Sequence, residues 1–296
     1  MDEHAHQLRH GRPSRRRIFA RRLAAVVAVV VLLGGGAAAA LAIHRKSAPP
    51  PPSTTIRQLR QFRIVFPEGF TRAEMALRVR DVAKIAKRES HHAVKLTEAA
   101  YLAATKQPRV IPGFGSAPHK IEGFLFPDTY DFDRKSTSTE LVREQLQEFQ
   151  QEWRTLDLSY ARSKNLTPYD VLIIASMVEG EAQVPSERPL VAAVIYNRLR
   201  LHMTLGIDAT LRYGLHIPPT QSLTESELAS DNPYNTRKFA GLPPTPIDNP
   251  GLASLRAAAQ PAHVDYLYFV RKPDHKHHYF TSNYQDFVNH ENEYGY

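Results

Sequence analysis

Hydrophobic and polar residues alternate with different periods along the chain, and these periods predict its elements. Residues 23–43 form an apolar run without a charged residue, and their number matches the ~20 residues with which a helix crosses a bilayer. Residues 171–178 are apolar on every side of a helix, which predicts a fully buried helix rather than an amphipathic one. The remaining segments show either the spacing of amphipathic helices or the alternation of strands.

The first segments after the apolar run predict a small strand–helix–helix module. Residues 62–66 are expected to form a strand, and residues 67–69 contain the Pro and Gly of a turn. Thr71 and Glu74 have the spacing of a capping box, which predicts that a helix begins there. A second helix is expected over residues 96–104.

Two further capping boxes predict helices in the middle of the chain. Thr137 with Glu140 begins an amphipathic helix whose opposite face is polar. Thr167 with Asp170 begins the helix that contains the buried apolar run. Gly180 can end that helix, because glycine is favoured just past a helix C-terminus.

The last third of the chain mixes helical and strand patterns. Residues 186–202 and 222–230 predict two helices, and Asn249 is the expected N-cap of a third. Residues 264–272 and 277–284 alternate like the two strands of a hairpin. Helices and strands do not follow one another in a regular rhythm, so the expected fold class is α+β.

Composition adds two exclusions to this picture. The chain has 296 residues, 42% apolar and 23% charged, which is typical of a globular protein with a sizeable core. Cysteine is absent, which excludes a disulfide scaffold and a thiolate metal site. The net charge is +8, of which residues 1–46 carry +7. Basic residues beside an apolar run indicate membrane topology more than nucleic-acid binding, so no nucleic-acid partner is expected.

The basic and apolar segments together predict an orientation at a membrane. Residues 1–22 are expected to be a cytoplasmic tail and residues 23–43 a transmembrane helix, which leaves the bulk of the chain outside the cytoplasm. A cleaved signal peptide is the alternative, but the run exceeds the usual ~7–15-residue apolar core, so an uncleaved anchor is favoured. Residues 44–61 contain a run of prolines and are expected to form an extended linker.

Glu179 follows the buried apolar run directly and is the first candidate for chemistry. A carboxylate at the end of a buried helix must be neutralised, paired or used. Burial favours the neutral form of a carboxyl group, which suits a general acid. The alternative is a structural carboxylate that pairs with Arg188 or Arg198. For Glu181, a structural role as a cap or an ion-pair partner is favoured.

Two groups of polar residues are candidates for binding sugars, because amides, arginines and aromatic rings can bind hydroxyl and N-acetyl groups. Each group has a structural alternative, namely helix-end packing for the first and a well-formed connector for the second. The first group contains Asn197, Arg198, Asp208 and Thr210, and the second contains Tyr234, Asn235 and Thr236.

Histidines near the end of the chain raise the question of a metal. Their spacing fits no ligand pattern of known metal sites, so the favoured interpretation is a polar hairpin tip, and no metal site is expected. The histidines concerned are His275, His277, His278 and His290.

Five segments carry a resemblance to a known family, in the order in which the family has them: 121–132, 175–215, 231–236, 241–251 and 266–270. They resemble the membrane-bound endolytic murein transglycosylases, the MltG or YceG-like family. The long segment around Glu179 is the most specific, and the resemblance extends over about residues 62–296. Gly180 is a departure, because the family usually has lysine there.

The resemblance implies a reaction and an organisation. The family cleaves the β-1,4 bond between N-acetylmuramic acid and N-acetylglucosamine in peptidoglycan and leaves 1,6-anhydro ends, without a cofactor. Glu179 would be the general acid and then the base. Residues 62–112 would form a LysM-like module, and residues 113–296 the catalytic domain. The substrate-binding candidates are Glu122, Glu181, Asn197, Arg198, Asp208, Thr210, Tyr213, Tyr234, Asn235 and Thr236.

The resemblance also implies partners and a location. The partners would be peptidoglycan strands and the lipid bilayer, which one helix crosses. Whether peptidoglycan synthases are further partners is left open. The location would be the cytoplasmic membrane, with the catalytic domain outside. Two alternatives are a hydrolytic muramidase and a non-catalytic peptidoglycan-binding scaffold. A third alternative, a DNA-binding membrane protein, is supported only by the N-terminal arginines.

Overall fold

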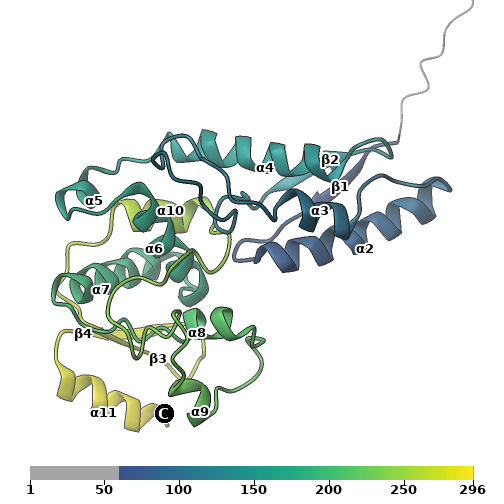
Figure 1. Ribbon diagram of the computed structural model, residues 1–296. Coiled ribbons are helices and arrows are strands. Elements are labelled where there is room, and N and C mark those ends of the chain that lie inside the picture. Colours follow the sequence, from purple (N-terminus) through teal and green to yellow (C-terminus); the bar gives the residue numbers. More distant parts are fainter. Residues whose placement is uncertain (1–59, 296) are drawn as a thin grey trace, which may run out of the picture. The chain divides into compact units, whose positions relative to one another are not determined.

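The computed structural model describes residues 60–295, which belong to one compact unit (Figure 1). Helices and short strands follow one another without a regular rhythm, as the α+β prediction requires. The predicted tail, transmembrane helix and most of the linker lie outside the described residues. None of the helices within residues 60–295 combines the length and the apolar composition of a membrane span.

The N-terminal part of this unit combines a two-stranded sheet with three helices (Figure 1). Strand β1 (Phe62–Val65) pairs antiparallel with β2 (Thr129–Phe132), and Phe62 lies opposite Phe132. Helix α2 (Arg72–Ser90) packs against α3 (Glu98–Ala104), which packs against α4 (Ser138–Trp153). Elements from both sides of the predicted boundary after residue 112 thus pack together, since β1 pairs with β2 and α3 packs against α4.

Capping explains why several helices begin where they do. In each predicted capping box, the Thr hydroxyl accepts from the backbone N–H three residues on, and the acidic side chain accepts from the Thr N–H. These two bonds satisfy backbone groups that a helix start leaves free. The boxes, all confirmed, are Thr71–Glu74, Thr137–Glu140 and Thr167–Asp170.

The centre of the unit is the buried helix α6 (Pro168–Glu181), which packs against α7 (Arg188–Arg200) and α10 (Leu252–Ala259). Every residue of α6 from Val171 to Val178 is buried, as its apolar run predicts. The helix continues past Gly180 and ends at Glu181. A short helix, α5 (Ser159–Ser163), and a 3-10 turn, η1 (Pro185–Glu187), flank this core.

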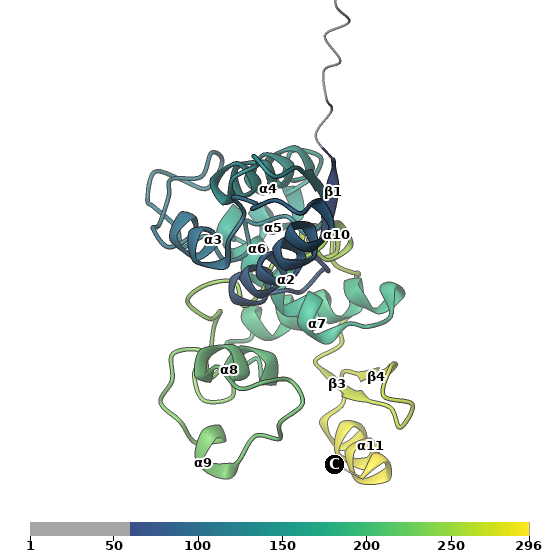
Figure 2. The same ribbon diagram turned by 90° about the vertical axis from the view of Figure 1, so that its right-hand side faces the viewer.

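The C-terminal part surrounds the far end of α7. Figure 2 shows α8 (Asp208–Leu215) and α9 (Glu225–Leu228) on one side, and strands β3 (Tyr268–Arg271) and β4 (His278–Thr281) with α11 (Tyr284–Tyr294) on the other. The predicted hairpin is confirmed, with β3 antiparallel to β4. Its second strand ends earlier than expected, because the Asn283 side chain accepts from the Asp286 N–H and begins a helix.

Asn249 is not the N-cap of α10, contrary to the prediction. Gly251 occupies that position. The Asn249 Oδ1 accepts from the backbone N–H groups of Gly123 and Leu125, both at 2.9 Å. Its Nδ2 donates to the Phe70 carbonyl at 2.9 Å. A single amide thus joins the start of α2, the loop before β2 and the start of α10.

Candidate active site

Glu179 lies in the last turn of α6, and its carboxyl group has two partners. An Arg188 Nη lies 3.3 Å from Oε1, and the backbone N–H of Gly251 donates to Oε2 at 3.1 Å. The Glu179 side chain is only 7% exposed. Of the two arginines considered as partners, the structure gives Arg188, which also donates to Ser254. The carboxyl group is therefore oriented from two sides, by a cation and by the start of α10.

A turn from the N-terminal module covers this carboxyl group. A Cβ placed on Gly69 would lie 3.4 Å from the Glu179 Cγ. Glu68 lies 3.8 Å from the same Arg188 guanidinium, and a Cβ on Gly251 would overlap the Glu68 carboxyl group. Burial raises the pKa of Glu68, the Glu179 charge raises it further, and Arg188 opposes both. Residues on both sides of the predicted domain boundary therefore build one site.

A pocket of about 500 Å³ opens beside Glu179. Its wall combines the start of α2, the end of α6, one face of α8 and the segment before α10. Glu179 does not itself line the pocket, but its neighbour Gly180 does, and so does Gly69, whose Cβ position is 3.4 Å from the Glu179 Cγ. The polar and glycine residues of the wall include Gly69, Arg72, Glu74, Glu122, Gly180, Arg212, Tyr213, His216 and Asp248.

Glu122, a predicted substrate-binding residue, is a buried carboxyl group in this wall, only 6% exposed. It accepts from the Arg72 backbone N–H and the Asn249 amide, both at 2.8 Å, and from the Tyr213 hydroxyl at 3.1 Å. Burial raises the pKa of Glu122 to about 7, although these hydrogen bonds oppose the shift. The structure thus brings Glu122 and Tyr213 together at the pocket.

Asp248 is a second buried carboxyl group in the wall, 5% exposed. Its Oδ1 has no hydrogen-bond partner within the described part of the chain. Burial raises the pKa of Asp248 well above its usual value, and the charges of Glu179 and Glu122 raise it further. The sequence did not single it out, although an acidic residue inside the apolar, proline-rich stretch 242–250 is a signal that could have done so.

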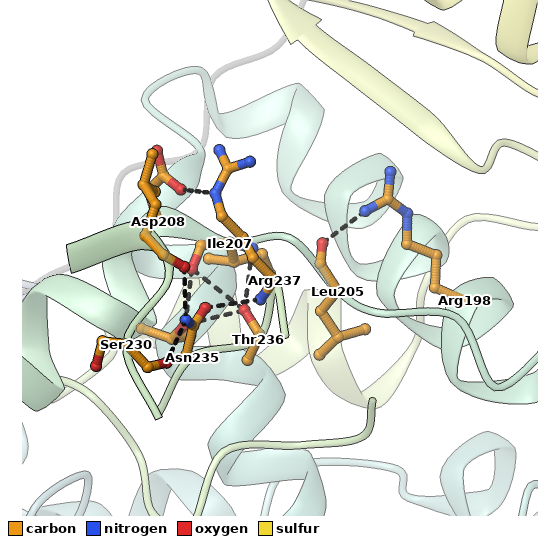
Figure 3. A network of polar contacts seen from close by, with 10 residues as sticks. Arg198, Leu205, Ile207, Asp208, Ser230, Asn235, Thr236 and Arg237 are labelled. Carbon is orange, nitrogen blue, oxygen red and sulfur yellow. Dashed lines mark hydrogen bonds and ion pairs between the residues drawn. The ribbon is translucent and has the colours of Figure 1, made fainter. Parts of the chain in front are cut away.

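Glu181 and Asp208 lie near one another and are partly exposed. Burial raises the pKa of Glu181 to about 7, Arg271 lowers it, and Asp208 raises it. Asp208 forms an ion pair with Arg237, visible in Figure 3. The Glu181 and Asp208 side chains do not line the pocket beside Glu179, and contact of either with substrate stays a prediction.

Thr210, Asn235 and Thr236 belong to a buried polar cluster, which we call the Asn235 network and which Figure 3 shows in part. The Asn235 amide donates to the carbonyls of Leu228 and Ser230, at 2.9 and 2.8 Å. The Thr236 hydroxyl accepts from the Ile207 N–H at 3.0 Å and lies 2.9 Å from the Thr210 hydroxyl. These internal bonds explain the three residues without a ligand, and their contact with substrate stays a prediction.

Asn197 and Arg198 attach the end of α7 to the segment between α10 and β3. The Asn197 amide donates to the carbonyls of Val264 and Tyr266, both at 3.0 Å. Arg198 donates to the carbonyls of Leu267 and Leu205, both at 2.6 Å. These bonds match the helix-end packing that the sequence left open as the alternative.

Tyr234 lies beside the pocket residue Tyr213. The two rings meet edge to face, with centroids 5.2 Å apart. The Tyr234 hydroxyl is 2.7 Å from the Thr245 hydroxyl. Of the predicted binding residues, Glu122 and Tyr213 thus line the pocket, and Tyr234 supports it.

The histidines divide between the hairpin turn and more sheltered places. His275 and His277 are exposed at the turn, as the hairpin-tip interpretation expects. His278 is buried, which that interpretation did not foresee: its Nδ1 lies 2.8 Å from the Glu187 carboxylate. The His290 ring stacks on another ring of the C-terminal part, with centroids 3.8 Å apart. His278 thus attaches the C-terminal hairpin to Glu187, and the next residue is Arg188, the ion-pair partner of Glu179.

Comparison with known proteins identifies the class. Residues 42–293 match the YceG-like family, so the chain belongs to that family. A crystal structure of a yceG-like protein from Listeria monocytogenes has the same fold, with a TM-score of 0.63 and 28% identity over 77% of this chain and 75% of that one.

Curated relatives carry a more specific name. The chain is 32% identical over 219 residues to a protein of Bacillus subtilis named endolytic murein transglycosylase. The aligned region covers 71% of this chain and 59% of the relative. It is also 30% identical over 244 residues to a protein of the same name from Streptococcus pneumoniae. Here the aligned region covers 75% of this chain and 43% of the relative. The chain thus spans about half the length of these two relatives.

Proposed function

We propose that the protein is an endolytic lytic transglycosylase, which cleaves the MurNAc-β-1,4-GlcNAc bond inside peptidoglycan strands with Glu179 as its acid and base. The names of the relatives support the reaction class. The observation that carries the assignment to Glu179 is its carboxyl group, oriented by Arg188 and the Gly251 N–H next to a pocket large enough for sugar residues.

The proposed reaction needs one carboxyl group of the protein. Protonated Glu179 gives its proton to the glycosidic oxygen while the bond from that oxygen to the muramic C1 breaks. The resulting carboxylate then takes the proton of the muramic C6 hydroxyl, whose oxygen forms the new bond to C1. Because the nucleophile that forms the new bond to C1 belongs to the substrate, the paired carboxylates of hydrolytic glycosidases are not required.

The partners of Glu179 suit this sequence of steps. Arg188 and the Gly251 N–H are both positioned to stabilise a carboxylate, which is the form that the first proton transfer leaves behind. Gly69 and Gly180 have no side chains, so a sugar in the pocket can approach the wall in front of Glu179.

Residues outside the pocket complete the proposal. Residues 23–43 would anchor the protein in the cytoplasmic membrane with the catalytic part outside, where newly made glycan is found. The LysM-like module would hold glycan, and the presence of Arg72 and Glu74 in the pocket wall supports a role for its first helix in substrate binding. Glu181 and Asp208 would act on substrate only at a distance from Glu179.

The test is product analysis by mass spectrometry of peptidoglycan strands treated with the full-length protein. The native protein should yield 1,6-anhydro ends, and Glu179→Gln should lower the rate by about 10²–10⁴, the usual contribution of a general acid and base. Glu144→Gln, the same substitution on the exposed face of α4, is the matched control and should keep the native rate.

Other outcomes separate the alternatives. Reducing ends that carry solvent oxygen would identify a hydrolytic muramidase. Binding of strands without cleavage, by native and variant protein alike, would identify a scaffold. Cleavage by Glu179→Gln at the native rate would remove Glu179 from the mechanism.

A further inference from the structure

Asp248 and Asn249 are neighbours in the chain with opposite environments. Both are almost fully buried, and Asp248 lines the pocket. The Asn249 amide has partners for its oxygen and its nitrogen, at 2.8–2.9 Å. The Asp248 Oδ1 has none among the described residues. An acceptor that is buried without a partner costs free energy that the rest of the fold must offset.

The Asp248 carboxyl group faces the part of the pocket that two glycines leave open. Its Oδ2 lies 3.8 Å from the position that a Cβ would take on Gly180, and 4.0 Å from the corresponding position on Gly69. All three residues line the pocket. A ligand that enters this part of the pocket therefore lies beside the Asp248 carboxyl group.

No cation of the described chain forms an ion pair with Asp248. The negative charges of three other carboxyl groups raise its pKa instead, namely those of Glu179, Glu122 and Glu74. Burial and like charges both favour the protonated form of a carboxyl group. A protonated carboxyl group donates one hydrogen bond, which an ionised one cannot do. Asp248 is thus suited to donate to an acceptor oxygen of a ligand.

We propose that Asp248 is a second carboxyl group of the active site, and that it binds an acceptor oxygen of the glycan, a hydroxyl or N-acetyl oxygen, beside Glu179. This inference deepens the proposed function and rests on it for the identity of the ligand. Asp248 takes no part in proton transfer to the glycosidic oxygen. It contacts the sugar and fixes its position relative to Glu179.

The experiment measures binding of glycan strands, freed of stem peptides by an amidase, to full-length protein that carries Glu179→Gln and cannot cleave them. Adding Asp248→Ala should weaken the affinity about tenfold, the loss expected for one hydrogen bond in a buried site. Adding Asp248→Asn should keep the affinity within about twofold, because the amide is uncharged, has nearly the same shape and still donates.

Two further measurements exclude a merely structural role. With Glu179 intact, Asp248→Ala should raise KM more than it lowers kcat, and Asp248→Asn should restore KM. The melting temperature of Asp248→Asn should equal or exceed that of the native protein, since an uncharged amide relieves the burial of an unpartnered acid. Asn249→Ala is the matched control, and it should lower the melting temperature because it leaves the N–H groups of Gly123 and Leu125 without an acceptor.

Failure of this inference is distinguishable from failure of the proposed function. If the native protein forms anhydro ends while Asp248→Ala keeps native affinity and KM, Asp248 does not bind the glycan. Equal losses of affinity in Asp248→Asn and Asp248→Ala would show that Asp248 acts as an ionised carboxylate and not as a hydrogen-bond donor. Unfolding of Asp248→Ala would show that the role of Asp248 is structural. Either result overturns the proposal. If the native protein binds strands without cleaving them and Asp248→Ala still weakens binding, the transglycosylase assignment is wrong. The proposal that Asp248 binds the glycan is then retained.

Discussion

The Asn235 network and the pocket beside Glu179 are both buried polar regions, but their hydrogen bonds differ. In the network, Asn235, Thr236 and Thr210 bond to backbone groups and to one another. In the pocket, Glu122 is buried with a pKa raised to about 7, and Asp248 has an oxygen without a partner. The network is thus explained by its own contacts, whereas the pocket contains one carboxyl oxygen, the Asp248 Oδ1, that has no partner among the described residues.

This difference separates two reasons for burying a polar side chain. A satisfied network contributes to stability and to a unique structure, and truncating it should destabilise the fold. An unsatisfied or protonated acid lowers stability, and replacing it by an uncharged analogue should stabilise the fold at the expense of binding. The sign of the stability change therefore distinguishes the two regions.

The largest expected effect is in the network. Asn235→Ala should lower the free energy of unfolding by about 3 kcal/mol, because it removes a fully buried amide and leaves two partly buried carbonyls without that donor. Urea unfolding of the full-length protein measures this change. The exposed Asn289→Ala on α11 is the control and should change stability by less than about 0.5 kcal/mol. Normal stability with a loss of glycan binding would instead make Asn235 a substrate contact.

The second effect concerns Glu122 and depends on pH. Its pKa is raised from 4.5 to about 7 by burial, so between these values the folded protein keeps a proton that the unfolded chain has released. Stability must therefore fall as the pH rises through this window. Glu122→Gln cannot release that proton, so the loss of stability between about pH 5 and about pH 8 should shrink by about 2 kcal/mol.

Unfolding curves of native protein and Glu122→Gln at both pH values test this prediction. Glu181 has its pKa raised in the same way, to about 7, so some pH dependence should remain in the variant. An unchanged pH dependence in Glu122→Gln would mean that Glu122 is ionised throughout, and that the donors around it outweigh its burial.

Local signals made much of the fold predictable. The boxes at Thr71, Thr137 and Thr167 and the apolar run of α6 each lie within a few residues of sequence, and each has the predicted structure. The second hairpin strand was predicted too long, because residues 282–284 continue its pattern while Asn283 caps a helix there. Local patterns thus found the elements and misplaced an end where two signals overlap.

The site was predictable only in part, because its contacts join distant parts of the chain. Glu179 and the two arginines considered as its partners lie within one short segment, but the sequence left open which arginine pairs with it, and the structure gives Arg188. The role of Asn249 did not, since its partner Gly123 is 126 positions earlier. The lack of a partner for Asp248 cannot be seen in a sequence either, because it depends on every element that packs around the pocket. Residue type indicated which side chains are polar, and only the fold shows what each one bonds.

The smallest expected effect tests how tightly the pocket wall is built. Gly180 is helical, and a Cβ there would make ordinary contacts, 3.4 Å to the Ala209 Cβ and 3.8 Å to the Asp248 Oδ2. Gly180→Ala should therefore raise the free energy of unfolding by about 0.4–1 kcal/mol, because alanine restricts the unfolded chain and favours the helix. Gly123→Ala is the contrasting control: Gly123 has a φ of +89°, and its Cβ would lie 2.6 Å from Pro246, so it should destabilise.

The same variant links the wall to Asp248. A methyl group at position 180 narrows the space in front of the Asp248 carboxyl group, so the affinity for glycan should fall slightly while stability rises. A gain in stability with unchanged affinity would place the sugar away from Gly180, and would leave Asp248 to be reached from the side of Gly69. Lower stability would show instead that the wall has no room for a methyl group, and that the last turn of α6 must keep glycine for packing alone.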